Sequence, residues 1–227
     1  MSKTIFVTAT DTGVGKTTVS AALANLLKER KKHVGYFKPI ETGCQPIPQD
    51  AKLLSKITGQ PLEEVVLYTF RQPVAPYVAE KIERKSIDVQ KIIKHFFRLK
   101  QKYEYLIIEG AGGICVPITK IKNRFYTYVD LIKDIKAQTL LVARGTLGTI
   151  NHTCMTVKIL KENEIKLIGI ILNLFEENDD VSQNTNSIVI MEMTGVPVLA
   201  KCKKTNTEPI QECKNSLQEK LERILKL

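Results

Sequence analysis

The stretch "VTATDTGVGKTT", Val7–Thr18, decides how the rest of the chain is interpreted. It ends in Gly-Lys-Thr, as a phosphate-binding loop does. The apolar, β-branched segment Thr4–Ala9 predicts a buried strand before it, and Lys16–Arg30 has apolar residues at helical spacing after it. Since a strand, a glycine-containing turn and a helix form the context in which such a loop binds phosphate, we predict a nucleotide site here.

Within this loop, the residue types match the contacts that a triphosphate needs. Gly13 and Gly15 allow the backbone to approach closely, so that its N–H groups can surround the phosphates. Lys16 would contact the β- and γ-phosphates, and the Thr17 hydroxyl would bind Mg²⁺. The alternative is an ordinary turn between a strand and a helix. The nucleotide-binding residues that the loop predicts are Gly13, Val14, Gly15, Lys16, Thr17 and Thr18.

The loop departs from two other types of phosphate loop. Thr10 stands where the pattern G-x-x-x-x-G-K-[ST] has its first glycine, which argues against a kinase or a GTPase. No lysine occurs in Asp11–Val14, whereas partitioning ATPases of the ParA and MinD type place a signature lysine early in a deviant loop. A partitioning switch that acts through partner proteins is therefore the less favoured alternative.

Strand-like and helix-like segments alternate along the chain. Apolar strands separated by helices are typical of a parallel sheet covered on both faces. We therefore predict an α/β fold with a doubly wound, mostly parallel sheet, P-loop NTPase-like, as a single domain over residues 1–227. The predicted strands are Thr4–Ala9, His33–Pro39, Glu104–Gly110, Thr139–Arg144, Lys166–Phe175 and Val196–Ala200. The predicted helices are Lys16–Arg30, Asp50–Thr58, Ile87–Gln101, Thr149–Glu162, Gln183–Met193 and Pro209–Leu225.

Composition and charge narrow the classes of function. No apolar run reaches the roughly 18–20 residues that a membrane span needs, and the N-terminus lacks a signal-peptide pattern, so we expect a cytoplasmic protein without a membrane partner. The 5 cysteines and 3 histidines are scattered, which indicates neither a disulfide framework nor a zinc site. The net charge is +10, but the basic residues are spread along the chain, so we expect no nucleic-acid partner.

Charged residues lie at the predicted strand ends, where such sheets bind ligands. Lys38 ends the second predicted strand, Asp50 begins the next helix, and Glu109 ends the third predicted strand. The alternatives are a lysine in solvent and an N-cap aspartate. As a group, Thr17, Asp50 and Glu109 offer the hard oxygen ligands that Mg²⁺ prefers. Lys38 would add an ammonium beside the phosphate loop, across the ends of the first two strands.

Four segments together resemble the dethiobiotin synthetase family. They are "FVTATDTGVGKT" (Phe6–Thr17), "GYFKPIETG" (Gly35–Gly43), "IIEGAGGICVP" (Ile107–Pro117) and "GTLGTINHT" (Gly145–Thr153). The resemblance covers roughly residues 1–200, and the family's loop begins T-x-T-D-T, which accounts for Thr10. It implies an enzyme that makes dethiobiotin from 7,8-diaminopelargonic acid, CO₂ and ATP, with Mg²⁺. One amine captures CO₂ as a carbamate, the carbamate attacks the γ-phosphoryl group, and the second amine closes the ureido ring.

The resemblance also implies roles for individual residues. Thr12, Lys16 and Lys38 would contact the reacting groups, and Asn173 would read the adenine. Arg71–Pro76 resembles the family's substrate loop. In a homodimer, Gly148–Asn151 would arrive from the second subunit, near the substrate carboxylate. The implied substrate-binding residues are Thr42, which would hold the carbamate, Gly112, Gly113, Thr149, Ile150 and Asn151.

A second kind of ATP-dependent enzyme remains as an alternative. Amidoligase-like ATPases such as cobyrinate a,c-diamide synthase share this type of loop. They usually carry an appended glutaminase domain with a catalytic cysteine, which we do not expect in a chain of 227 residues.

The segment Ala200–Lys204 leads to a prediction about the nucleotide base. The family has Gly-x-Ile-Pro after the sixth strand, in a loop that helps to close over the base, whereas this chain has "AKCKK". We therefore expect weak discrimination between ATP and other triphosphates. Turnover measured with ATP, GTP and CTP checks this expectation, and a strong preference for ATP would contradict it.

Overall fold

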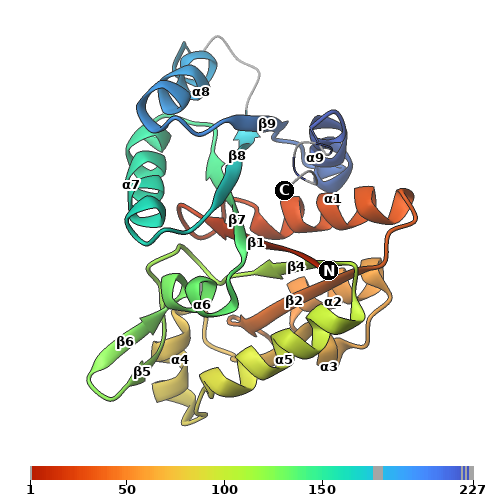
Figure 1. Cartoon of the computed structure of the whole chain (residues 1–227), viewed down its shortest axis with the longest axis vertical. Helices are drawn as coiled ribbons and strands as arrows, with labels where there is room; N and C mark the ends of the chain where they lie inside the picture. Colours follow the sequence, from red (N-terminus) through yellow and green to blue (C-terminus); the bar gives the residue numbers. More distant parts are fainter. Residues whose placement is uncertain (1, 176–180, 221, 223, 225–227) are drawn as a thin grey trace.

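The computed structural model describes residues 2–175, 181–220, 222 and 224. Seven strands form its central sheet: β1 (Lys3–Ala9), β2 (Val34–Glu41), β3 (Val66–Thr69), β4 (Tyr105–Glu109), β7 (Gln138–Arg144), β8 (Leu167–Phe175) and β9 (Val198–Lys203). Their order is β3-β2-β4-β1-β7-β8-β9, and all the pairings are parallel (Figure 1). A separate antiparallel hairpin joins β5 (Pro117–Ile121) to β6 (Arg124–Thr127).

Helices cover both faces of the sheet. One face carries α1 (Lys16–Glu29), α2 (Gln49–Thr58), α3 (Leu62–Val65) and α9 (Pro209–Gln218). The other carries α4 (Pro76–Glu83), α5 (Val89–Lys102), α6 (Tyr128–Ile135), α7 (Thr149–Glu162) and α8 (Val181–Thr194). On β1, Ile5 and Val7 face the first core while Phe6 faces the second. The strands therefore read as continuous apolar runs because each side chain meets a helical layer.

The predicted fold class is confirmed, and each of the six predicted strands is present with boundaries shifted by up to three residues. The edge strand β3 was not predicted, because its four residues follow a short helix without a clear apolar period. The hairpin and the helices α3, α4 and α6 were also missed. The predicted closing helix is present as Pro209–Gln218, while Leu221 and Leu225 lie outside the described residues.

The sheet order changes one expectation about the site. Strand β4 pairs with both β1 and β2, so it lies between the first two strands of the chain. Lys38 therefore lies next to the phosphate loop across β4, and not directly across two adjacent strand ends. Glu109, the last residue of β4, is placed between them.

Two further findings concern the C-terminal part and the helices. The expected loop Ala200–Lys204 is largely strand, because β9 extends to Lys203. The backbone N–H of Lys204 donates to the carbonyl of Phe175, which prolongs the pairing with β8. The helices of the described chain have at most 14 residues, and none of them could cross a bilayer.

Candidate active site

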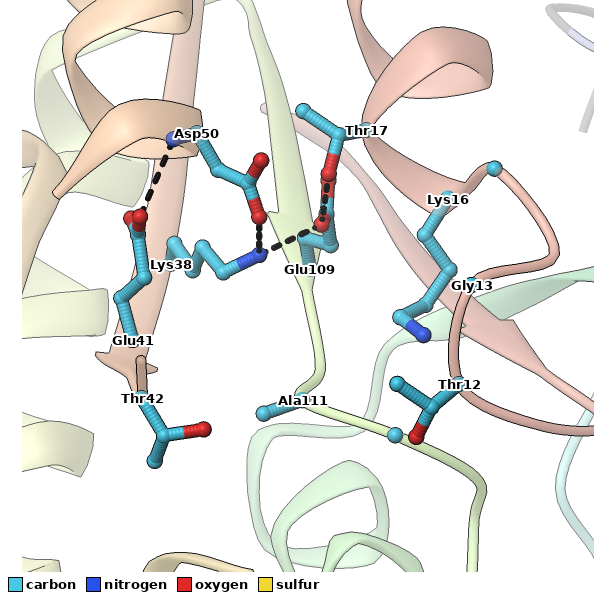
Figure 2. Close-up of a pocket in the computed structure, with 12 residues that line it drawn as sticks. Thr12, Gly13, Lys16, Thr17, Lys38, Glu41, Thr42, Asp50, Glu109 and Ala111 are labelled. Carbon is cyan, nitrogen blue, oxygen red and sulfur yellow. Dashed lines mark hydrogen bonds and ion pairs between the residues drawn. The ribbon is translucent and has the colours of Figure 1, made fainter. Parts of the chain in front are cut away.

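A pocket of about 310 Å³ opens at the carboxyl ends of β1, β2 and β4 (Figure 2). This is the edge at which open α/β sheets bind ligands. The phosphate loop forms one side, and the segments after β2 and β4 form the others. Its lining residues are Thr12, Gly13, Gly15, Lys16, Thr17, Lys38, Glu41, Thr42, Asp50, Glu109, Ala111 and Gly112.

The phosphate loop is shaped by its glycines. Gly13 has φ of 72° and Gly15 has φ of 94°, backbone angles that residues other than glycine rarely adopt. Gly15 also leads directly into α1, whose first turn has no side-chain cap among the described residues. The first N–H groups of that helix therefore point toward the pocket without a side-chain partner, as an anion site requires.

Glu109 is the centre of the site. Its carboxylate has no exposed surface, and it accepts four hydrogen bonds from protein side chains. Thr17 Oγ1 donates at 2.8 Å and Lys38 Nζ at 2.7 Å to Oε1. Ser20 Oγ donates at 2.8 Å and Tyr36 Oη at 2.9 Å to Oε2. A buried carboxylate is costly unless it is paired in this way.

Lys38 joins the two carboxylates that were predicted to bind metal. Its ammonium lies 2.5 Å from Asp50 Oδ2 as well as 2.7 Å from Glu109 Oε1 (Figure 2). Lys38 is only 4% exposed, so the alternative of a lysine in solvent is excluded. Its place is inside β2, three residues before the end of that strand.

The environment changes the pKa values of all three buried charges. Burial acts against the ammonium of Lys38, but Glu109 and Asp50 outweigh it and raise the pKa of this lysine. Burial likewise acts to raise the pKa of Glu109, but the charge of Lys38 outweighs it, and the net shift is downward. For Lys16, burial dominates and lowers the pKa, with Glu109 acting in the opposite direction. The raised pKa of Lys38 and the lowered pKa of Glu109 both favour the charged forms of this pair.

The start of α2 is held by a residue that was not predicted to act there. Glu41, the last residue of β2, accepts hydrogen bonds from the backbone N–H groups of Asp50 at 3.0 Å and Ala51 at 2.9 Å. The helix begins at Gln49 after Pro48, so Asp50 is not its N-cap. Because Glu41 satisfies the helix end, the Asp50 side chain is available to Lys38.

The structure brings three of the remaining predicted site residues to this pocket and places the others elsewhere. Thr12, Thr42 and Gly112 line it, and they also line an adjoining cavity of about 210 Å³ formed with the loop Pro73–Pro76. Gly113 lies on a third, more apolar cavity of about 440 Å³, between the phosphate loop and α7. Val14 is buried in the core, and Thr18 lies on the first turn of α1.

Within one chain, two sets of predicted ligand-binding residues do not line the pocket. Asn173, predicted to read adenine, is 3% exposed and donates from Nδ2 to the carbonyl of Val14 at 2.9 Å. Thr149, Ile150 and Asn151 form the first turn of α7 and line none of the cavities described above. The residues of α7 that face the third cavity are His152, Met155, Thr156 and Ile159.

Three residues that contact the predicted site residues were missed in the sequence: Ser20, Tyr36 and Glu41. Ser20 lies one helical turn after Lys16, on the side of α1 that faces Glu109. Tyr36 lies two residues before Lys38 on β2, so both side chains point to the same face of the sheet. A polar residue at such spacing from a predicted site residue was the signal available. Glu41 contacts an element nine residues away, which no local pattern reveals.

Comparison with known proteins agrees with this geometry. A family model described as an AAA domain matches residues 3–206. The chain is 47% identical over 192 residues to the ATP-dependent dethiobiotin synthetase of Aquifex aeolicus, covering 85% of each chain. It is 41% identical to that of Clostridium acetobutylicum, covering 86% of this chain and 83% of the relative.

The chain belongs to the dethiobiotin synthetase family. Among solved structures, it is similar to the MinC:MinD complex of Aquifex aeolicus, with a TM-score of 0.64 and 13% identity over 100% of this chain and 96% of that one. It is also similar to MinD with Mg-ADP from Pyrococcus horikoshii, with a TM-score of 0.60 and 14% identity over 99% and 96%. At this identity the similarity to MinD concerns the fold alone. The sequence relatives, together with the lack of a signature lysine in Asp11–Val14, favour the dethiobiotin synthetase family over the partitioning ATPases.

The buried ion pairs of this family member give a testable prediction. Replacing Lys38 by Met leaves Glu109 charged and without its counter-ion, so we expect the free energy of unfolding to fall by about 3 kcal/mol. Adding Glu109→Gln removes that charge and should recover part of the loss. Urea unfolding of both single variants and the double variant, in metal-free buffer, measures the coupling, and strictly additive losses would contradict it.

The same variant should show a changed dependence on pH. In the unaltered protein, the lowered pKa of Glu109 stabilises the folded state at pH values above the pKa that this group has in the unfolded chain. This stabilisation is lost as the pH falls through the lower pKa of the folded state. Without Lys38, burial raises the pKa of Glu109, so protonation in mild acid relieves the strain. The deficit of Lys38→Met should therefore be larger at pH 7 than at pH 4.5.

Proposed function

We propose that this chain is an ATP-dependent dethiobiotin synthetase, which uses 7,8-diaminopelargonic acid, CO₂ and ATP and releases dethiobiotin, ADP and phosphate. The observation that supports it most is the placement of two lysines, Lys16 and Lys38, on one pocket with a buried carboxylate between them. In Figure 2 the Lys38 ammonium points toward Asp50 and Glu109, and the Lys16 amine lies on the phosphate-loop side of the pocket, near Thr12. This arrangement suits a reaction between two anions, a carbamate and a γ-phosphate.

The chemistry follows from the charges of the reactants. An amine that has captured CO₂ is an anionic carbamate, and its approach to the γ-phosphate is opposed by Coulomb repulsion. Lys16 at the phosphate loop and Lys38 on β2 offset this repulsion, while Thr12 and Thr42 lie on the wall between the phosphate pocket and the adjoining cavity. Carbamate attack on the γ-phosphoryl group expels ADP. The second amine then attacks the activated carbon, closes the ring and expels phosphate, so no protein nucleophile is needed.

A magnesium ion fits the residues that are present. Thr17, Asp50 and Glu109 would hold it, and the two carboxylates already bind one cation, the Lys38 ammonium, between them. Mg²⁺ takes few protein ligands and completes its shell with phosphate oxygens and water. No group of three His, Cys, Asp or Glu side chains is placed for a metal in the part of the chain that the structure describes. When bound, Mg²⁺ neutralises phosphate charge.

The organic substrate is assigned to the cavities that adjoin the phosphate pocket. Gly112 and the Pro73–Pro76 loop line the smaller one, and Gly113 lines the larger, apolar one. An apolar wall suits the hydrocarbon chain of diaminopelargonic acid. Since Thr149, Ile150 and Asn151 line neither cavity, their assigned contact with the substrate carboxylate requires a second subunit. We therefore infer a homodimer in which these residues serve the partner's site.

The function is tested by forming the product. Purified protein incubated with diaminopelargonic acid, bicarbonate and MgATP should yield dethiobiotin, detected by mass spectrometry, together with one phosphate per ring. Lys16→Met and Thr17→Ala should abolish the product, because each removes a contact to the phosphates or their metal.

The melting temperature of each variant without nucleotide serves as the control, and it should stay close to that of the unaltered protein. A variant that keeps full activity would remove its residue from the site. ATP consumption without a ring-closed product would instead favour the amidoligase or switch alternatives.

The dimer is tested through exposed apolar side chains. Leu147, before α7, is 82% exposed, and Met155 and Met193, on α7 and the adjacent α8, are 57% and 65% exposed. Because exposed apolar side chains are typical of interfaces, we propose that these three residues belong to the contact between subunits. Light scattering should give twice the 25.6 kDa chain mass, and Leu147→Glu should give monomers. Ile82→Glu, on α4 and 55% exposed, is the matched control that should stay dimeric, and a Leu147→Glu dimer would contradict the assignment.

A further inference from the structure

The two oxygens of the Glu109 carboxylate are held from different sides. Oε1 accepts from Thr17 and Lys38, both of which line the phosphate pocket (Figure 2). Oε2 accepts from Ser20 and Tyr36, both of which have 0% exposure and line none of the cavities described above. The carboxylate therefore has one oxygen on the pocket side and one in the core.

The two core donors come from two different elements, a strand beside β4 and a helix that packs over it. Tyr36 is on β2, which pairs with β4, and Ser20 is on α1, which covers the same face of the sheet. Their hydroxyls reach Oε2 at 2.9 Å and 2.8 Å. The terminal torsion of a glutamate is broad when it is unrestrained. Two donors converging on one oxygen remove this freedom and fix the plane of the carboxylate.

The fixed plane matters because the pocket oxygen has two competing uses. Thr17 and Lys38 donate to Oε1 in this structure, and the proposed metal would need the same atom. If the carboxylate could rotate, either of its oxygens could bind Lys38 on the pocket side, and the position of the oxygen that binds the metal would not be fixed. With Oε2 saturated by hydroxyls, Oε1 stays at the position that Thr17 also faces.

We propose that Tyr36 and Ser20 are positioning residues, which hold Glu109 so that a single oxygen is presented to the magnesium ion of the bound nucleotide. They do not touch the nucleotide themselves and act through Glu109. The inference rests on the magnesium site of the proposed function. Outer partners of this kind typically change metal affinity by about 10- to 100-fold when removed.

The test measures how much Mg²⁺ strengthens nucleotide binding. The dissociation constant of ADP is measured by calorimetry with Mg²⁺ and with EDTA, for the unaltered protein, Tyr36→Phe, Ser20→Ala and the double variant. We expect the gain from Mg²⁺ to shrink by about tenfold in the double variant, while ADP binding in EDTA stays unchanged, because the phosphate loop is intact. Each single variant should lose a smaller part.

Tyr126→Phe is the matched control. Its hydroxyl donates to Asp134 at 2.7 Å, so the variant also removes a tyrosine–carboxylate hydrogen bond, but in the β6–α6 region away from the pocket. It should keep the full Mg²⁺ effect. Ser20→Ala protects the test if Tyr36→Phe does not fold, because alanine favours the helix in which Ser20 lies.

Three results would overturn the proposal. One is an undiminished Mg²⁺ effect in the double variant, and another is an equal loss with and without Mg²⁺, which would mean a purely structural role. The third is an unaltered protein whose ADP affinity does not depend on Mg²⁺, which would refute the metal site as well. None of these removes the proposed enzyme reaction, because dethiobiotin formation is measured separately.

Discussion

A carboxylate without exposed surface is the constraint on which this site depends. Glu109 ends strand β4, between β2 and β1, and in that position its buried charge would be strongly destabilising unless several donors reached it. The donors come from α1 and β2, so the position of one side chain ties together the phosphate loop's helix and two strands. The hydrogen bonds that compensate for burying this carboxylate thus also place Thr17 and Lys38 on the wall of the pocket.

The lysine on β2 adds a buried positive charge at the same point. An ammonium among desolvated carboxylates interacts more strongly than it would in water, and it needs no rearrangement of solvent when a second anion arrives. Within the protein, Lys38 balances part of the negative charge of Glu109 and Asp50. Its neighbour along the strand, Glu41, holds the start of α2 and keeps Asp50 in reach of the same ammonium.

The fold and most of the pocket could be predicted from the sequence because both depend on local patterns. The apolar runs predicted six strands, and Gly15-Lys16-Thr17 with Glu109 predicted which ends would meet. The features that could not be predicted are interactions that join distant segments without a local sequence pattern. The insertion of β4 between β1 and β2, the capping of α2 by Glu41 and the hold of Tyr36 on Glu109 are of this kind. Strand β9 was misjudged at its end because "AKCKK" has little apolar character.

The order of the strands has a consequence for how the pocket comes into being. Glu109 is separated by 92 residues from Thr17 and by 71 from Lys38, and the strand that carries it joins the two others. Contacts between such distant segments cost more chain entropy to form and slow the folding reaction. A nascent chain that ends before β4 has the phosphate loop and the β2 lysine but lacks the strand that pairs with both β1 and β2 and the carboxylate that binds Thr17 and Lys38. Nucleotide chemistry therefore becomes available only once the middle of the chain has been made and has inserted between its two earliest strands.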